Sequence, residues 1–198
     1  MKLRLLIILA ASLVTIGAGN ADLGKAKAAT CAACHGQDGN SMVGLWPSLA
    51  GQNVNYLVRQ LQHIKSGKRP ITEMTGMLDN FSTDDLEDIA AFYASQNNTI
   101  GQVAADKVEL GRKLYYSGSL EKGIPACTAC HSPKGKGNAP AGYPLLSGQQ
   151  AEYIAMTLKN YRSGKRDNDE SSQMMMAIAY KLDDVEIDAL SSFINGLY

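Results

Sequence analysis

The sequence lacks the features that mark nucleic-acid-binding or membrane-spanning proteins. Its 19 basic residues balance its 19 acidic ones. Neither half carries a large excess of one sign, because residues 22–100 have six basic and eight acidic side chains and residues 101–198 have eleven of each. This balance gives no support to nucleic-acid binding. Beyond the N-terminal segment, no apolar run reaches the roughly 20 residues that a spanning helix needs.

Cysteine and histidine are also scarce, and nearly all of them fall in two copies of one pentad. The copies are residues 31–35, Cys-Ala-Ala-Cys-His, and residues 127–131, Cys-Thr-Ala-Cys-His. The two-residue spacer places the thiols about one helical turn apart, and the histidine follows on the same turn. This arrangement is typical of c-type haem, in which both thiols bond the vinyl groups and the imidazole ligates the iron. We predict two covalently bound haem c groups, attached at Cys31, Cys34, Cys127 and Cys130 and ligated by His35 and His131.

Other uses of paired cysteines fit this spacing less well. A zinc ribbon needs its second pair roughly 15–20 residues after the first, whereas 92 residues separate Cys34 from Cys127. A thioredoxin-like site would accompany a βαβ pattern, and none is present. Two disulfides stay open as an alternative, although they give no reason for a histidine directly after each pair.

The N-terminal segment predicts export from the cytoplasm. Lys2 and Arg4 precede an apolar run from Leu5 to Ile16, and small residues then lead to Ala21. This order is typical of a secretory signal peptide, which we assign to residues 1–21 with cleavage after Ala21. The apolar run is short for a spanning helix, but retention of the segment as an anchor stays open. Export agrees with c-type haem, which is attached outside the cytoplasm, and predicts a periplasmic protein.

An internal repeat extends well beyond the pentads. Pro47–Gln52 matches Pro144–Gln149, and Ser66–Arg69 matches Ser163–Arg166, each 97 residues later. Nearer the ends of the two halves the offset grows to 101. Two homologous domains explain these matches. We place them at residues 22–100 and 101–198, with the polar, small segment around 97–105 as the linker.

Both halves are expected to be helical, because no run alternates polar and apolar residues long enough to indicate a sheet. Apolar residues recur at helical spacing in matching segments of the two halves, namely Val54, Leu57, Leu61 and Ile64, and Ala151, Ile154, Leu158 and Tyr161. Gly67 and Gly164 fit the left-handed stop just past a helix end. Closing helices are expected to start at Ser82 and Asp183, which can cap free backbone amides. The fold class is therefore all-α.

Methionine is the best candidate for the sixth iron ligand. Met74 lies seven residues before Phe81, and Met175 lies seven before the equivalent Leu182. We therefore predict Met74 and Met175 as axial ligands. Met77 in the first half, and Met174 or Met176 in the second, stay open as alternatives. The spare imidazole, His63, has Asn160 as its counterpart, and we interpret it as a surface or packing residue.

Neighbouring residues are expected to orient the haem and its ligands. A ligating imidazole normally donates its second ring N–H to a carbonyl or carboxylate, and we predict the carbonyls of Pro47 and Pro144 as the acceptors. Five further side chains are candidates for contact with haem propionates: Tyr56, Tyr153, Arg59, Arg69 and Arg166.

Together these motifs resemble those of the dihaem cytochrome c4 family, over everything after the signal peptide. The resemblance rests on both pentads, the Glu73–Met77 segment, Met175, the repeated Pro-x-Leu-x-Gly-Gln segments and the closing helices. It implies two tandem class I cytochrome c domains related by pseudo-twofold symmetry, with one haem each. It also implies that the haem propionate edges lie near one another, so that electrons pass between the haems.

The function expected from these features is electron transfer without bond chemistry, between a membrane respiratory donor and a terminal oxidase or reductase. His/Met ligation fills both axial positions of each iron. We expect a monomer, with peripheral membrane association left open. Two alternatives stay open: the dihaem subunit of a flavocytochrome-type sulfide dehydrogenase, and a haem peroxidase with one five-coordinate iron.

Overall fold

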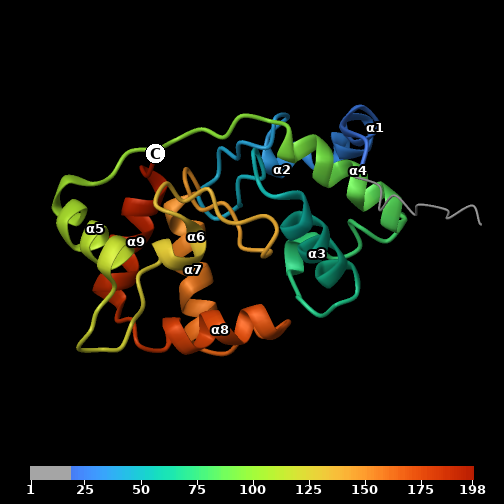
Figure 1. Ribbon diagram of the computed structural model, residues 1–198. Coiled ribbons are helices and arrows are strands. Elements are labelled where there is room, and N and C mark those ends of the chain that lie inside the picture. The colour runs from blue at the N-terminus through green and yellow to red at the C-terminus, as the bar shows by residue number, and fades with distance from the viewer. Residues whose placement is uncertain (1–18) are drawn as a thin grey trace, which may run out of the picture.

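The computed structural model describes residues 19–198, so most of the predicted signal peptide lies outside the described residues. Within these residues the chain is helical and has no strand, only isolated bridges at Ser119–Ile124 and Asn138–Tyr143 (Figure 1). The prediction of an all-α fold is confirmed. None of the helices in this part of the chain has the length and apolar character needed to cross a bilayer.

The N-terminal domain is built on a crossing of its first and last helices. Its elements are α1 (Ala21–Lys27), η1 (Ala28–Thr30), α2 (Ala32–His35), α3 (Val54–Lys65), η2 (Thr72–Met74) and α4 (Thr83–Ala94). Gly24 of α1 lies so close to α4 that a Cβ there would overlap the carbonyl oxygen of Asp88. The small residue is therefore what allows α1 and α4 to pack together.

The C-terminal domain repeats this plan with one insertion and one extra helix. Its elements are η3 (Ala105–Lys107), α5 (Val108–Ser117), α6 (Thr128–His131), α7 (Ala151–Arg162), α8 (Glu170–Ala179) and α9 (Asp184–Asn195). Gly111 of α5 sits against α9 as Gly24 sits against α4. The insertion is a short turn closed by the Ser119–Ile124 bridge.

The predicted helix boundaries are confirmed. Ser82 and Asp183 cap α4 and α9, and each forms a capping box with the acidic residue three positions later, Asp85 or Glu186. Gly67 and Gly164 follow α3 and α7 with φ of +74° and +76°. At the start of α1, the side chain of Asn20 accepts hydrogen bonds from two backbone amides.

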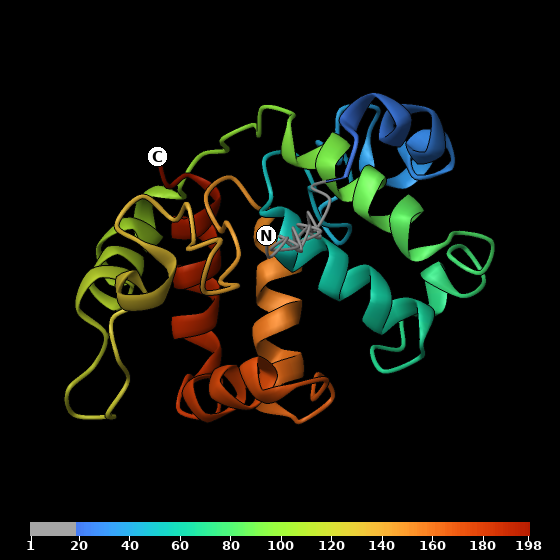
Figure 2. The ribbon, with the colours of Figure 1, turned by 45° about the vertical axis from the view of Figure 1, so that its right-hand side comes forward.

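The two domains lie side by side, joined by an irregular segment between α4 and η3 (Figure 2). The predicted boundary between residues 100 and 101 falls in this segment and stays a prediction. The contact is reciprocal: the Gln52 side chain donates to the carbonyl of Leu145 at 2.9 Å and accepts from its amide at 2.8 Å. Gln149 makes the same pair of bonds to Ser48, both at 2.8 Å. Since each residue stands 97 positions from its counterpart, the domains are related by pseudo-twofold symmetry.

Candidate haem-binding sites

The first pentad forms a single helical turn. The amide of His35 donates to the carbonyl of Cys31 at 2.9 Å, closing the turn of α2. Gly36 then ends it with φ of +80°, and a Cβ at this position would collide with the carbonyl oxygen of Asn40. The turn thus holds Cys31, Cys34 and His35 in one short rigid segment.

The second pentad forms the same turn with a different end. The amide of His131 donates to the carbonyl of Cys127 at 3.0 Å. Here the residue with positive φ is Ser132, at φ 66° and ψ 159°, a region that is otherwise almost restricted to glycine. The Ser132 carbonyl accepts a hydrogen bond of 2.8 Å from the buried hydroxyl of Tyr115.

Both pentad histidines are oriented by a proline carbonyl, as predicted. Nδ1 of His35 lies 2.9 Å from the Pro47 carbonyl oxygen, and Nδ1 of His131 lies 3.1 Å from that of Pro144. Burial lowers the pKa of both imidazoles, outweighing the opposite effect of the carbonyls. A neutral ring that donates from Nδ1 presents its Nε2 lone pair, which is the form that ligates a metal.

All four cysteines have unpaired, half-buried thiols. Burial raises the pKa of Cys31 and raises that of Cys127 to about 11. Paired thiols beside an oriented imidazole are the donor set that covalent haem c requires, so the residues present fit this cofactor.

The two predicted methionine ligands lie on different local structures. Met74 ends the single 3₁₀ turn η2, whereas Met175 lies in the middle of α8. Met175 packs against the buried core of the C-terminal domain, which Cys127 also contacts, while the side chain of Met174 is 47 % exposed. Met77 in the first half is similarly exposed. These positions favour Met175 over Met174, and the ligand assignments stay predictions.

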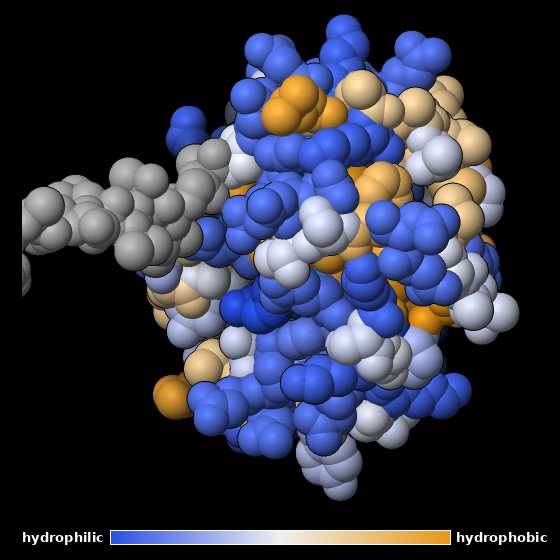
Figure 3. Space-filling model, turned by 90° about the vertical axis from the view of Figure 1, so that its right-hand side faces the viewer, coloured by the Kyte–Doolittle hydropathy of each residue, from blue (hydrophilic) through white to orange (hydrophobic). Residues whose placement is uncertain are grey.

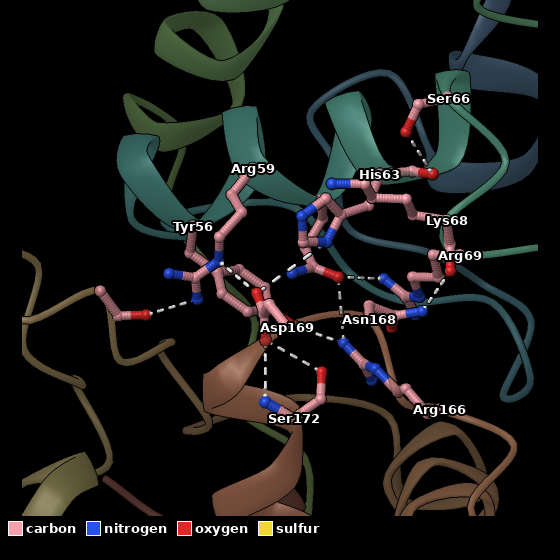
Figure 4. A network of polar contacts seen from close by, with 12 residues as sticks. Tyr56, Arg59, His63, Ser66, Lys68, Arg69, Arg166, Asn168, Asp169 and Ser172 are labelled. Carbon is pink, nitrogen blue, oxygen red and sulfur yellow. Dashed lines mark hydrogen bonds and ion pairs between the residues drawn. The ribbon is translucent and has the colours of Figure 1, made fainter.

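Charged and aromatic side chains from both domains meet at the domain junction (Figure 4). Arg69 donates to the hydroxyl of Tyr153, and Arg166 donates to that of Tyr56, both at 2.9 Å. These two bonds are again related by the offset of 97 residues. Both arginines also reach the amide oxygen of Gln60, at 2.8 Å and 3.3 Å.

This junction has more positive charge than its partners neutralise. Arg166 is 6 % exposed, and its Nε is buried without a hydrogen-bond partner. Burial would raise the pKa of Tyr153, but Arg69 and Arg166 outweigh it and lower this pKa to about 7. The unsatisfied Nε of Arg166, and the positive field of the two arginines that lowers the pKa of Tyr153, fit a nearby anion such as a haem propionate.

Sequence reasoning missed two features of the junction. The roles of Gln52 and Gln149 were not assigned, although their place in the repeat could have indicated a symmetric contact. Asp169, which faces Arg59 across the junction, has no sequence signal. His63, interpreted as a surface or packing residue, lies beside it with a side chain that is 14 % exposed.

Comparison with known families places a cytochrome domain in each half. Residues 108–197 match the family described as cytochrome c. Residues 20–92 match the family described as subunit III of cbb3-type cytochrome c oxidase.

Full-length similarity is to electron-transfer cytochromes. A protein named thiosulfate dehydrogenase electron acceptor, from Stutzerimonas stutzeri, is 34 % identical over 84 % of this chain and 78 % of its own. The crystal structure of reduced recombinant cytochrome c4 from Pseudomonas stutzeri superposes with a TM-score of 0.89 at 47 % identity. It covers 91 % of this chain and 100 % of that one. Cytochrome c4 from Azotobacter vinelandii is 49 % identical over 98 % of this chain and 97 % of its own. With two cytochrome domains and two Cys-x-x-Cys-His pentads that bind covalent haem c, this chain belongs to the cytochrome c4 family of dihaem electron-transfer proteins.

Proposed function

We propose that this cytochrome works in the periplasm, passing electrons from a membrane respiratory donor to a terminal oxidase or reductase. In this proposal His35 and Met74 ligate one iron, and His131 and Met175 ligate the other. Each bound haem supplies one-electron Fe(III)/Fe(II) chemistry. The chain fixes the ligands in advance, which limits the rearrangement that accompanies each transfer.

The observation that carries the proposal is the pair of neutral, oriented imidazoles. Because the carbonyls of Pro47 and Pro144 hold each Nδ1, each Nε2 points away from them with its lone pair free. The reciprocal junction supports exchange between the two sites, since Arg69 and Arg166 can hold propionates from both haems near one another. On the face of the N-terminal domain shown in Figure 3, hydrophobic patches are scattered among hydrophilic residues. Docking is therefore expected to depend on local shape more than on bulk charge.

The axial ligands are tested by spectroscopy of the holoprotein. Two haems per chain and two methionine-to-ferric-iron charge-transfer bands are expected in the unaltered protein. Met175→Ala should remove the band of one haem, whereas Met174→Ala and Met176→Ala should leave both. Loss of a band in Met174→Ala or Met176→Ala, with Met175→Ala unaffected, would move the assignment to that residue.

The role as a shuttle is tested with cell fractions. The protein is expected in the periplasmic fraction, reduced by quinol-oxidising membranes and reoxidised by the terminal enzymes. N-terminal sequencing of the exported protein locates the cleavage site. The result bears on the fold, because cleavage after Ala21 would remove Asn20, the cap of α1. Recovery only with the membrane, after salt washing, would support a retained anchor instead.

A second candidate function is to accept electrons from a sulfur-oxidising dehydrogenase. The similarity to a thiosulfate dehydrogenase electron acceptor favours it. A purified thiosulfate dehydrogenase with thiosulfate should then reduce this cytochrome faster than quinol-oxidising membranes do. The reverse order of rates would favour the respiratory shuttle.

A further inference from the structure

The helix that carries Met175 begins at a residue shared by both domains. Asp169 is the N-cap of α8, and its Oδ1 accepts hydrogen bonds from the amide of Ser172 at 2.8 Å and from its hydroxyl at 3.0 Å. Capping of this kind fixes the first turn of a helix. The position of Asp169 therefore bears on the position of Met175, six residues or about 1.7 turns along.

The other carboxylate oxygen of Asp169 faces the N-terminal domain. Its Oδ2 lies 3.4 Å from Nε of Arg59 and 3.9 Å from Nδ1 of His63, both on α3. The preceding residue strengthens the contact, since Asn168 donates from Nδ2 to the carbonyl of Lys68 at 2.6 Å. Figure 4 shows this group side by side with the arginine pair of the junction. The start of α8 is thus held by the Arg59 guanidinium and the Lys68 carbonyl, which both belong to the other domain.

The N-terminal domain has no matching arrangement. The positions equivalent to Arg59 and His63 are Met156 and Asn160, which carry no charge. Met74 ends η2, whose N-cap, Ile71, makes no side-chain capping bond. Pseudo-symmetry therefore fails at the segments that deliver the two methionines.

We infer that Asp169 is a positioning residue for the C-terminal haem, through which Arg59 of the N-terminal domain holds the helix that delivers Met175. The inference rests on the proposed ligation by Met175. It means that contact between the domains controls how firmly the sulfur stays on that iron. The N-terminal haem lacks such control.

Substitutions borrowed from the pseudo-symmetric half separate this role from helix capping. Asp169→Asn keeps a good N-cap but removes the charge. Arg59→Met introduces the residue found at position 156 and removes the opposite charge. In each variant we expect methionine displacement from the C-terminal haem at raised pH to become about threefold easier, as for loss of one partly exposed ion pair. The N-terminal haem should be unchanged.

The direction of the effect distinguishes positioning from simple electrostatics. Charge acting through space would move the C-terminal haem potential in opposite directions in Asp169→Asn and Arg59→Met. A loosened helix would ease methionine displacement in the same direction in both, and the double variant would add little to either single one. Lys107→Gln, which removes an exposed ion pair with Asp188, is the matched control and should change neither haem.

The measurement is NMR of the ligand methionine methyl groups, with each haem assigned through Met74→Ala and Met175→Ala, together with redox titration. If Met175→Ala leaves both methionine signals in place, the proposed ligation fails. If Met175 is the ligand but Asp169→Asn and Arg59→Met leave its displacement unchanged while the protein stays folded, the positioning role is overturned.

Discussion

The two domains hold the pentad histidine in the same way and differ in the local structure around the proposed methionine ligand. In both, a one-turn helix ends in a histidine whose Nδ1 faces a proline carbonyl. Met74 comes from a single 3₁₀ turn, whereas Met175 comes from a capped helix tied to the other domain. The histidine turn is therefore the same in both domains, whereas the segments that carry the proposed methionine ligands differ.

The domains also differ in the cores that support these sites. The buried cluster of the C-terminal domain draws on α5, α7 and α9 and includes Cys127 and Met175 at its edge. The cluster of the N-terminal domain is smaller and contacts Cys31 but not Met74. We expect the C-terminal domain to be the more stable one, since larger buried apolar clusters contribute more to stability.

Substitution of the glycine at each helix crossing should have the largest effect on stability, and it can be made separately in each domain. Gly24→Ala and Gly111→Ala each force a methyl group into the backbone of the facing helix, and each should cost about 3 kcal/mol, the upper part of the range for overpacking. Thermal unfolding of the holoprotein measures both. Each variant should destabilise its own domain first. A cost below 1 kcal/mol at either site would show that its crossing relaxes easily.

The reciprocal glutamines test whether the two sides of the junction are equal. Gln52→Ala leaves the buried amide and carbonyl of Leu145 without partners and should cost about 2 kcal/mol. Gln149→Ala should cost less, because Gln52 is 5 % exposed and the bonds of Gln149 are only partly buried. Denaturant unfolding gives both values. Equal costs would show that local burial does not distinguish the two sides.

Exchange of the residues that end the pentad turns should act in opposite directions. Gly36→Ser places a side chain at positive φ against the Asn40 carbonyl and should destabilise the N-terminal domain by about 1–3 kcal/mol. Ser132→Gly relieves the same conformation and should stabilise the C-terminal domain by about 0.5 kcal/mol, after loss of the bond from the Lys136 amide. The pair is compared by melting temperature. Destabilisation by Ser132→Gly would mean that its hydroxyl outweighs the backbone strain.

The smallest expected effect is a pH dependence confined to one side of the junction. Burial lowers the pKa of His63, and Arg59, Lys68 and Arg69 lower it further, while Asp169 opposes them. Stability is therefore complete above the ordinary pKa of 6.5 and is lost as pH falls through the lower pKa of the folded state.

His63→Asn, which copies position 160, should flatten this loss on the acid side and leave stability at pH values above 7 nearly unchanged. Melting temperatures of the variant and the unaltered protein, between neutral and mildly acidic pH, test it. An identical acid-side loss in the variant would assign it to other groups.

Much of the fold and half of each site could be predicted from the sequence because the signals are local. Ser82 and Asp183 mark helix starts through bonds made within three residues. The pentads specify their own one-turn geometry, and the carbonyls of Pro47 and Pro144 were found because the repeat places a proline at nearly the same distance after each histidine. The methionines were harder, since three adjacent candidates follow Gln173 and only packing separates them.

The sequence by itself determined two helical domains, their haem attachment points and the matching turns that hold the two pentad histidines, because these depend on spacing along the chain. Only the tertiary structure decided how the domains meet. Three contacts across the junction join residues 84 to 110 positions apart: Arg69 with Tyr153, Arg166 with Tyr56, and Asp169 with Arg59. No periodicity encodes such contacts, because they form only when two finished surfaces come together and their charges must find partners.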